Sequence, residues 1–211
     1  MKLILVRHGE TEWVREHRYQ GSTDVPLNQC GYRQAQALAR FIRKERPAAI
    51  YSSKLMRAQE TAKFIARACR KKVMSDVRLN EVSFGDWEGE SHDGIRIRFP
   101  EAAKRWYRAY WSSKPPGGES LRSLNHRISK FLKHLVRRFS KRDETCVVVT
   151  HGGPIRMFLI QLLEMHPKIF WSLRIDTASI SVVTVVGGGK QLVLLNSQEH
   201  LNGLRRGGKA K

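Results

Sequence analysis

Two short apolar segments, far apart in the chain, each end in a His-Gly dipeptide. The first covers residues 3–6 and runs into Arg7-His8-Gly9; the second covers residues 146–150 and runs into His151-Gly152-Gly153. Short apolar runs of this kind are typical of strands buried in a parallel sheet. The carboxyl ends of such strands meet at one edge of the sheet, where α/β folds bind their ligands. The sequence therefore predicts that one arginine and two histidines come together at that edge.

The rest of the chain alternates between apolar extended segments and amphipathic helical patterns, which indicates an α/β fold. Strands are expected at residues 2–6, 48–52, 72–75, 146–150, 179–186 and 191–196. Helices are expected from Asn28 or Gln29 until Pro47 breaks the pattern, at 54–70, from Glu119 or Ser120 to Phe139, and at 155–163. The glycine triplet at 187–189 predicts a hairpin between the last two strands.

Two polar segments between the His-Gly motifs add an arginine and a carboxylate. Arg57 lies near the start of the helix expected at 54–70, and Glu81 lies in the segment Leu-Asn-Glu-Val-Ser-Phe-Gly-Asp-Trp-Glu-Gly of residues 79–89. With Arg7, His8 and His151 they form a set of two arginines, two histidines and one glutamate. Guanidinium and imidazole groups suit a doubly charged phosphoryl group, so the set indicates phosphoryl chemistry.

Taken in order, the motifs RHGETEW, RYQGSTDVPLN, YSSKLMRAQETA, LNEVSFGDWEG, PGGES and VVVTHGG resemble those of the histidine phosphatase superfamily. Within that superfamily, which has the phosphoglycerate-mutase-like fold, the chain is most similar to the branch of small phosphatases and α-ribazole phosphatases. The motifs span residues 3–153, and the apolar stretch near 179–186 extends the likeness. A single Arg-His-Gly would be weak, but the ordered set is specific.

The resemblance implies a three-layer α/β/α sandwich with a mostly parallel, Rossmann-like sheet and an antiparallel edge strand. One domain is expected over residues 1–201, with a helical insertion at about 91–114 that is rich in aromatic side chains. Residues 202–211 are expected to form a basic, disordered tail. A length of 211 residues is in the range of a single domain.

The same resemblance gives each of the five residues a role. His8 would be the nucleophile and form a phosphohistidine, since a neutral imidazole is a competent nucleophile near pH 7. Arg7 and Arg57 would hold the equatorial oxygens, and His151 would donate a further hydrogen bond, most effectively when protonated. Glu81 would protonate the leaving alkoxide and then accept a proton from the attacking water. No metal ion or other cofactor is expected, because the cationic side chains substitute for a metal.

Each of these side chains also has an ordinary interpretation. Arg57 could be a surface cation of its helix, and His151 could merely end a strand, although the Gly152-Gly153 helix start after it favours an anion. Three nearby carboxylates compete with Glu81 for the acid role: Asp86, Glu88 and Glu90. Trp87 is expected in the core, and the remaining histidines are expected to be exposed: His17, His92, His126, His134, His166 and His200.

Recognition of the substrate is expected from a loop that the resemblance places beside the phosphate pocket. Its residues are Gln20, Gly21, Ser22 and Thr23, and Gly152 is expected to contribute as well. The segment 118–120 matches another motif near the site without an assigned role. One position departs from the family pattern: many relatives have Asn after the Trp of the first motif, where this chain has Val14. An amide that could bind the phosphoryl group is therefore missing.

A formal net charge of +20 raises the question of a polyanionic partner. Clustered Lys and Arg neutralise the phosphates of nucleic acids. Here, however, most cations fall on the polar faces of helical patterns, as Arg40, Arg43, Lys44 and Arg46 do, and no known nucleic-acid-binding module surrounds them. We expect solvated helix faces with weak, salt-sensitive adhesion to polyanions, and no specific nucleic-acid partner.

A cytoplasmic location is expected. The apolar runs are too short to cross a membrane, and the N-terminus lacks the apolar region of a secretory signal. The three cysteines, Cys30, Cys69 and Cys146, are odd in number and have no metal-binding spacing, so neither a disulfide framework nor a structural zinc is expected. This is typical of a reducing compartment. The oligomeric state is left open between monomer and homodimer.

Three classes of function are consistent with these residues. We favour a phosphatase that acts on small phosphomonoesters, because the set of five side chains is complete. A cofactor-dependent phosphoglycerate mutase is the alternative, although the chain looks too short for the extra sequence that covers a mutase site. A basic polyanion-binding protein with a weakened pocket is the third, motivated by the charge and by Val14. Sugar phosphates, phosphoglycerates, nucleotides and the nucleotide-loop precursor of cobalamin all remain possible substrates.

Overall fold

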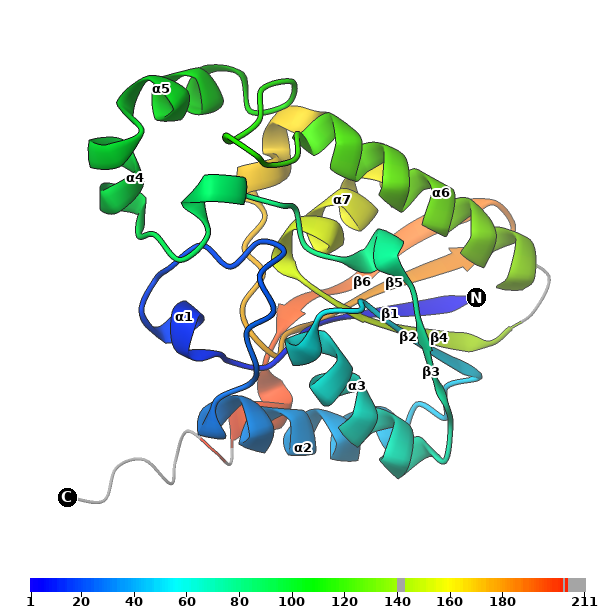
Figure 1. Cartoon of the computed structure of the whole chain (residues 1–211). Coiled ribbons are helices and arrows are strands. Elements are labelled where there is room, and N and C mark those ends of the chain that lie inside the picture. Colours follow the sequence, from blue (N-terminus) through cyan, green and yellow to red (C-terminus); the bar gives the residue numbers. More distant parts are fainter. Residues whose placement is uncertain (140–142, 203, 205–211) are drawn as a thin grey trace.

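The computed structural model describes residues 1–139, 143–202 and 204, and it contains one six-stranded sheet (Figure 1). The strands are β1 (Lys2–Arg7), β2 (Ala49–Ser52), β3 (Val73–Ser75), β4 (Thr145–Thr150), β5 (Ile180–Val186) and β6 (Gly189–Ser197). Their order is β3-β2-β4-β1-β5-β6; the first four are parallel, and β5 and β6 are antiparallel. The expected α/β sheet is confirmed, with two antiparallel strands at its edge where one was expected.

Helices cover both faces of this sheet and give it three layers (Figure 1). They are α1 (Glu12–Arg15), α2 (Gln29–Arg43), α3 (Met56–Cys69), α4 (His92–Arg98), α5 (Pro100–Ala109), α6 (Leu121–Phe139) and α7 (Gly152–Leu162). Helices α2 and α3 pack on one face, and α6 and α7 pack on the other. Helices α4 and α5 fall within residues 91–114, where a helical insertion is predicted. Helix α2 begins where the sequence predicts, because the Asn28 side chain accepts a hydrogen bond from Gly31 N at 2.8 Å.

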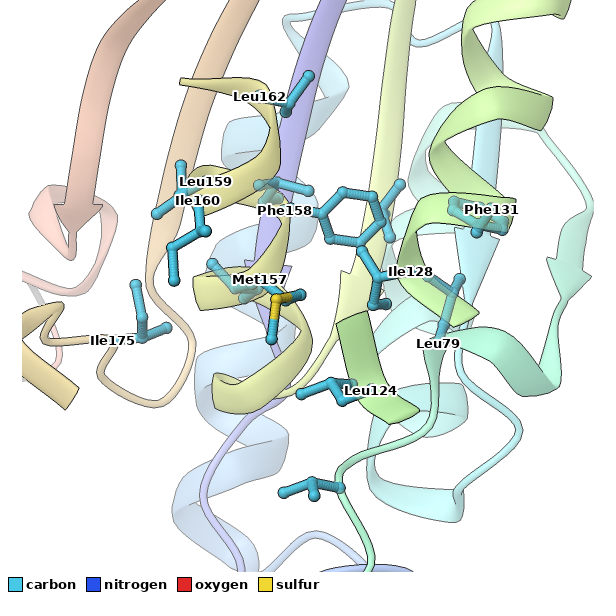
Figure 2. Packing of buried hydrophobic residues seen from close by; sticks show 14 of the residues in the cluster. Leu79, Leu124, Ile128, Phe131, Met157, Phe158, Leu159, Ile160, Leu162 and Ile175 are labelled. Carbon is cyan, nitrogen blue, oxygen red and sulfur yellow. The ribbon is translucent and has the colours of Figure 1, made fainter. Parts of the chain in front are cut away.

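The central strands are buried on both faces, as their unbroken apolar runs predict. In β1, Ile4 and Val6 belong to the cluster under α2 and α3, whereas Leu3 and Leu5 belong to the cluster under α6 and α7. This alternation follows from the two-residue period of a strand. Figure 2 shows the second cluster, in which Phe158 of α7 lies between the sheet and α6. The helices on both faces therefore hold β1 and β4 in the middle of the sheet.

Gly9 lies where the loop after β1 approaches the start of α2. A Cβ atom on Gly9 would lie 2.6 Å from the backbone oxygen of Gly31, which is closer than real Cβ contacts. Gly9 therefore permits a close approach to the start of α2. It allows the loop after β1 to lie against that helix.

Some expectations were wrong or fall outside the described residues. His134 and His200 are partly buried where exposure was expected, whereas His17, His92, His126 and His166 are exposed. Burial lowers the pKa of His200 to about 4. Trp87 is fully buried, as predicted. The short helix α1 and the 3-10 segment Pro167–Ser172 were not anticipated. Of the expected tail, residues 203 and 205–211 lie outside the described part of the chain.

The cations that the sequence placed on a polar helix face are exposed, and they lie in the last turn of α2 and just after it: Arg40, Arg43, Lys44 and Arg46. Among the described residues, no helix is both long and apolar enough to cross a bilayer.

Candidate active site

The two His-Gly motifs meet at the carboxyl edge of the sheet. β1 and β4 are neighbouring parallel strands whose register pairs Arg7 with Thr150, so both strands end at the same level. His8 and His151 follow directly, and their ring centroids lie 5.0 Å apart. His8 is also tied to β4, because its backbone N donates to Thr150 O at 3.0 Å. The predicted meeting of the two imidazoles is confirmed.

The surroundings of His8 leave one ring nitrogen available as a nucleophile. Nδ1 lies 2.7 Å from the carbonyl oxygen of Gly9, which can only accept a hydrogen bond. Nδ1 therefore carries the proton in the neutral ring, and the lone pair is on Nε2. Burial, followed by the nearby charges of Arg57 and Arg7, holds the pKa of His8 well below 6.5. The ring is thus neutral at pH 7.

Backbone carbonyl groups hold the guanidinium groups of Arg7 and Arg57 through their Nη atoms, and the Nε atoms stay available for a ligand. Nη1 of Arg7 donates to Ile175 O at 2.6 Å, and Arg57 donates to Thr23 O at 2.8 Å and to Gly21 O at 2.7 Å. Both Nε atoms are buried and have no acceptor in the part of the chain that the structure describes. Buried donors without a partner are rare, and at a site they indicate a bound anion. Burial lowers the pKa of Arg57 to about 10, so it is still charged at pH 7.

His151 is oriented by a chain of hydrogen bonds through Ser53. The Ser53 hydroxyl donates to Asn80 Oδ1 at 3.0 Å, so it accepts the proton of His151 Nε2 at 2.8 Å. His151 Nδ1 is then the bare nitrogen, and it is buried without a partner among the described residues. Burial, and next the charge of Arg57, holds the pKa of His151 well below 6.5. His151 can donate to a phosphoryl oxygen through Nδ1 only when the ring takes up a second proton.

The Glu81 carboxylate sits at the N-terminus of α7. Glu81 Oε1 accepts from Gly153 N at 3.1 Å and from Val82 N at 2.9 Å. A Cβ atom on Gly153 would lie 2.3 Å from Glu81 Oε1, so this carboxylate position requires glycine. Glu81 lines the same cavity as Arg7, His8 and Arg57.

The three competing carboxylates are engaged elsewhere or lie outside the cavity. Glu88 accepts from the backbone N of Ser22 and of Thr23 at 2.8 Å each. Glu90 pairs with Arg98, and Asp86 is exposed. None of the three lines the cavity that holds His8. The geometry favours Glu81 among the four carboxylates.

Arg127 of α6 positions the segment that carries Glu81. It donates to three carbonyl groups at or near that residue: Arg78 O at 2.7 Å, Asn80 O at 2.5 Å and Glu81 O at 3.0 Å. Glu119 pairs with Arg127 at 2.9 Å and donates its backbone N to Ser83 O at 2.8 Å. The motif at 118–120 thus acts by bracing the Glu81 loop. Arg127 was missed because it is one of many basic residues on its helix.

The expected substrate loop is only partly in the cavity. Gln20 and Gly21 line it, as does Gly152. The side chains of Ser22 and Thr23 instead bind the Glu88 carboxylate, and Thr23 supplies only its carbonyl to Arg57. Val14 of α1 also lines the cavity, at the position where the family pattern has an amide.

Several residues at the cavity mouth were not anticipated. Arg156, Phe170 and Trp171 form one wall, and His17 and Arg18 lie in the lining with Val14. His17 has a left-handed backbone conformation with φ of 56°. Arg156 lies four residues after Gly152 on α7, so helical spacing could have placed it above the Gly-Gly turn. The aromatic wall comes from an irregular 3-10 segment that no periodicity predicts.

The cavity has a volume of about 310 Å³, which suits a small ligand. It offers two charged guanidinium groups with free Nε donors, a neutral nucleophilic imidazole and one carboxylate. Across the described residues, no group of three or more His, Cys, Asp and Glu side chains is arranged to hold a metal ion. This arrangement can bind a tetrahedral anion and transfer it to a nitrogen.

Known proteins resemble this chain over most of its length. The family model described as "Histidine phosphatase superfamily (branch 1)" matches residues 3–198. Phosphoserine phosphatase 1 of Hydrogenobacter thermophilus is 37% identical over 201 residues, which cover 95% of this chain and 94% of the relative. The adenosylcobalamin/alpha-ribazole phosphatase of Salmonella typhimurium is 30% identical over 200 residues, covering 94% and 97%.

A solved structure gives the same likeness in three dimensions. Phosphoserine phosphatase from Entamoeba histolytica, in complex with 3-phosphoglyceric acid, has a TM-score of 0.83 and 32% identity. The match covers 95% of this chain and 98% of that protein. These findings confirm both the resemblance and the expected fold.

Proposed function

The chain belongs to the histidine phosphatase superfamily, and on this premise we propose that it hydrolyses small phosphomonoesters through a phosphohistidine on His8. The observation that carries the proposal is the grouping of a neutral His8 with the unpartnered Nε donors of Arg7 and Arg57 around one small cavity. Relatives named as phosphatases of phosphoserine and of alpha-ribazole support a phosphomonoester hydrolase.

In the first step, His8 Nε2 attacks phosphorus while the bond from phosphorus to the ester oxygen breaks. The electron pair of that bond goes to the leaving oxygen, which Glu81 protonates. The alcohol departs and the phosphoryl group stays on Nε2. The Nδ1–H···O hydrogen bond to Gly9 stabilises the positive charge that develops on the His8 ring.

In the second step, a water molecule attacks the phosphohistidine and gives a proton to the Glu81 carboxylate. The bond between Nε2 and phosphorus breaks, its electron pair returns to Nε2, and inorganic phosphate leaves. Glu81 therefore acts as an acid and then as a base, and the enzyme is restored. The carboxylate is held for both steps by Gly153 N and Val82 N.

Arg7, Arg57 and His151 stabilise the phosphoryl group while it moves from the ester oxygen to His8 and then to water. Positioned cations lower the barrier because they stabilise the charge that is spread over the three equatorial oxygens in the transition state. A bound dianion also favours protonation of His151 at Nδ1, opposing the burial that lowers its pKa. The protonated ring can then donate to a phosphoryl oxygen.

Hydrolysis is favoured over a mutase reaction by the composition of the cavity wall. A mutase must keep water from its phosphohistidine while the substrate turns over. The insertion at 91–114 contributes no residue to the described lining of this cavity, so nothing from it covers His8. The described lining therefore includes nothing from this segment that would shield the intermediate from water.

Two assays on the purified protein test this function. We expect release of inorganic phosphate from a panel of phosphomonoesters in the presence of EDTA, together with a phosphorylated protein that is stable to base and labile to acid. We expect little interconversion of 2- and 3-phosphoglycerate. Isomerisation with negligible phosphate release would show a mutase, and the absence of both activities would refute an active site.

A further inference from the structure

The carboxylate of Glu88 does not line the cavity, yet it joins two loops that do. One of its oxygens accepts hydrogen bonds from Ser22 N at 2.8 Å and from Phe84 N at 2.9 Å, and the other accepts from Thr23 N at 2.8 Å. The hydroxyl groups of Ser22, Thr23 and Ser83 also donate to it. Donors from two loops that are far apart in the sequence therefore converge on one carboxylate.

The backbone that donates to Glu88 is the backbone that holds Arg57. Arg57 Nη2 donates to Gly21 O at 2.7 Å, and Nη1 donates to Thr23 O at 2.8 Å. Gly21 O and Ser22 N belong to one trans peptide group, whose C=O and N–H point in opposite directions. The carboxylate binds one side of this peptide group and the guanidinium group binds the other. Each charge polarises the peptide group in the sense that strengthens the opposite hydrogen bond.

The turn at Gly21 is built closely around the Glu88 carboxylate. Gly21 has a φ of 51°, in the left-handed region, and a Cβ atom there would lie 2.0 Å from Glu88 Oε1. Only glycine leaves room for that oxygen. The carboxylate is therefore part of the structure of this loop.

Glu88 carries its charge at pH 7. Burial by itself would raise the pKa of Glu88, but the hydrogen bonds from Thr23, Ser22 and Phe84 outweigh it and hold this pKa below its usual value. Burial lowers the pKa of Arg57, and the negative charge of Glu88 is among those that oppose this effect. The two side chains thus act on each other both through the peptide groups and through space.

We propose that Glu88 is a positioning residue for the phosphoryl end of the cavity, because it holds the carbonyl groups of Gly21 and Thr23 that orient Arg57 toward the phosphoryl group. The inference rests on the proposed function. Glu81 keeps its own hydrogen bonds to Gly153 N and Val82 N. Loss of the Glu88 carboxylate should therefore weaken phosphoryl binding for every ester, whatever its leaving group.

Glu88→Gln tests this role, because it keeps the shape of the side chain and removes its charge. Whichever way the new amide turns, its NH2 group faces a backbone N–H, so at least one loop is released. We expect the affinity for inorganic phosphate, measured by isothermal titration calorimetry, to fall by about 10-fold. We expect kcat/KM to fall by about 10- to 100-fold for 4-nitrophenyl phosphate and for an alkyl phosphate alike. The matched control is Asp86→Asn, which removes an exposed carboxylate of the same loop and should change neither quantity.

A double-mutant cycle separates positioning of Arg57 from a general structural role. Arg57→Lys removes the paired donors that the carbonyl groups of Gly21 and Thr23 orient. If Glu88 acts through Arg57, adding Glu88→Gln to Arg57→Lys should weaken phosphate binding by less than about threefold more. Losses that simply add, or a loss confined to the alkyl phosphate, would overturn the proposal.

Thermal unfolding checks that each variant is folded. If Glu88→Gln does not fold, Thr23→Val removes one hydroxyl donor to the carboxylate at nearly constant volume, and it should weaken phosphate binding by about two- to fivefold. Unchanged phosphate binding in that variant would overturn the role of Glu88. Calorimetry needs no turnover, so an unmodified protein that bound phosphate but hydrolysed no ester would refute the proposed function alone. An unmodified protein that bound no phosphate would overturn both.

Discussion

The two ends of the cavity are built in different ways. At the phosphoryl end, His8, Arg57 and His151 are no more than 1% exposed, and hydrogen bonds to the backbone or to buried side chains hold them. At the leaving-group end, Glu81 and Arg156 are half-buried, and Trp171 is exposed. The first end is rigid because the sheet supports it, and the second depends on loops and on bonds between them.

This difference assigns separate tasks to the two ends. A phosphoryl group is the same in every phosphomonoester. One rigid, buried arrangement of hydrogen-bond donors can therefore bind it in every substrate. The leaving group differs from substrate to substrate, and we propose that its contacts come from the loop that carries Glu81 and from the 3-10 segment with Trp171, which line the cavity. Changes at the phosphoryl end should therefore affect all substrates equally, and changes at the other end should depend on the leaving group.

His8→Ala should have the largest effect and should not depend on the substrate. Without the nucleophile, we expect turnover to fall by about 10³-fold or more and labelling of the protein by substrate phosphate to vanish. His126→Ala, at an exposed position of α6, serves as the control and should keep full activity. Retention of labelling in His8→Ala would rule out His8 as the nucleophile.

Glu81→Gln should separate substrates by their leaving groups. We expect hydrolysis of an alkyl phosphate to slow by about 10²- to 10⁴-fold, because an alkoxide needs a proton to leave. An aryl phosphate should lose less, since its leaving oxygen is a weaker base. Asp86→Asn removes an exposed carboxylate of the same loop and should change neither rate. Equal losses on both substrates would argue against the acid role.

Arg127→Met tests whether the Glu81 loop is positioned by α6. Loss of the three bonds to carbonyl groups should let the carboxylate move, and we expect kcat on an alkyl phosphate to fall by about 10- to 100-fold. KM should change little, and the loss should again be smaller for an aryl phosphate. The control is Arg122→Met, an exposed position on the same helix. A loss that did not depend on the leaving group would indicate general destabilisation.

Acidification should destabilise the phosphoryl end. His8 and His151 have folded-state pKa values well below 6.5, so below that pH the unfolded chain binds more protons than the folded protein. The free energy of unfolding should therefore fall as the pH drops below about 6.5, by at most about 1.4 kcal/mol per pH unit for each histidine. Urea unfolding between pH 7 and pH 5 measures this slope. His8→Asn should reduce it, and an unchanged slope in that variant would contradict a neutral, buried His8.

Val14→Asn should have the smallest effect and should act on all substrates. An amide at this cavity position can donate to the phosphoryl group, so we expect kcat/KM on ordinary sugar phosphates to rise by about two- to tenfold. Arg15→Gln, an exposed neighbour on α1, is the control. A decrease in Val14→Asn would show that the cavity is adapted to the apolar side chain.

The amino-acid sequence by itself determined the phosphoryl end. Each of its residues follows or flanks a short apolar strand, and the rule that parallel strands end at one edge is enough to bring His8 and His151 together. Only the tertiary structure decided the leaving-group end. The bonds from Arg127 to Asn80, from Arg156 to Leu173 and from Ser22 to Glu88 join residues that are 47, 17 and 66 positions apart in the chain. Periodicity reports which face of an element is buried, but it does not report which loops meet, because that depends on how the finished layers pack.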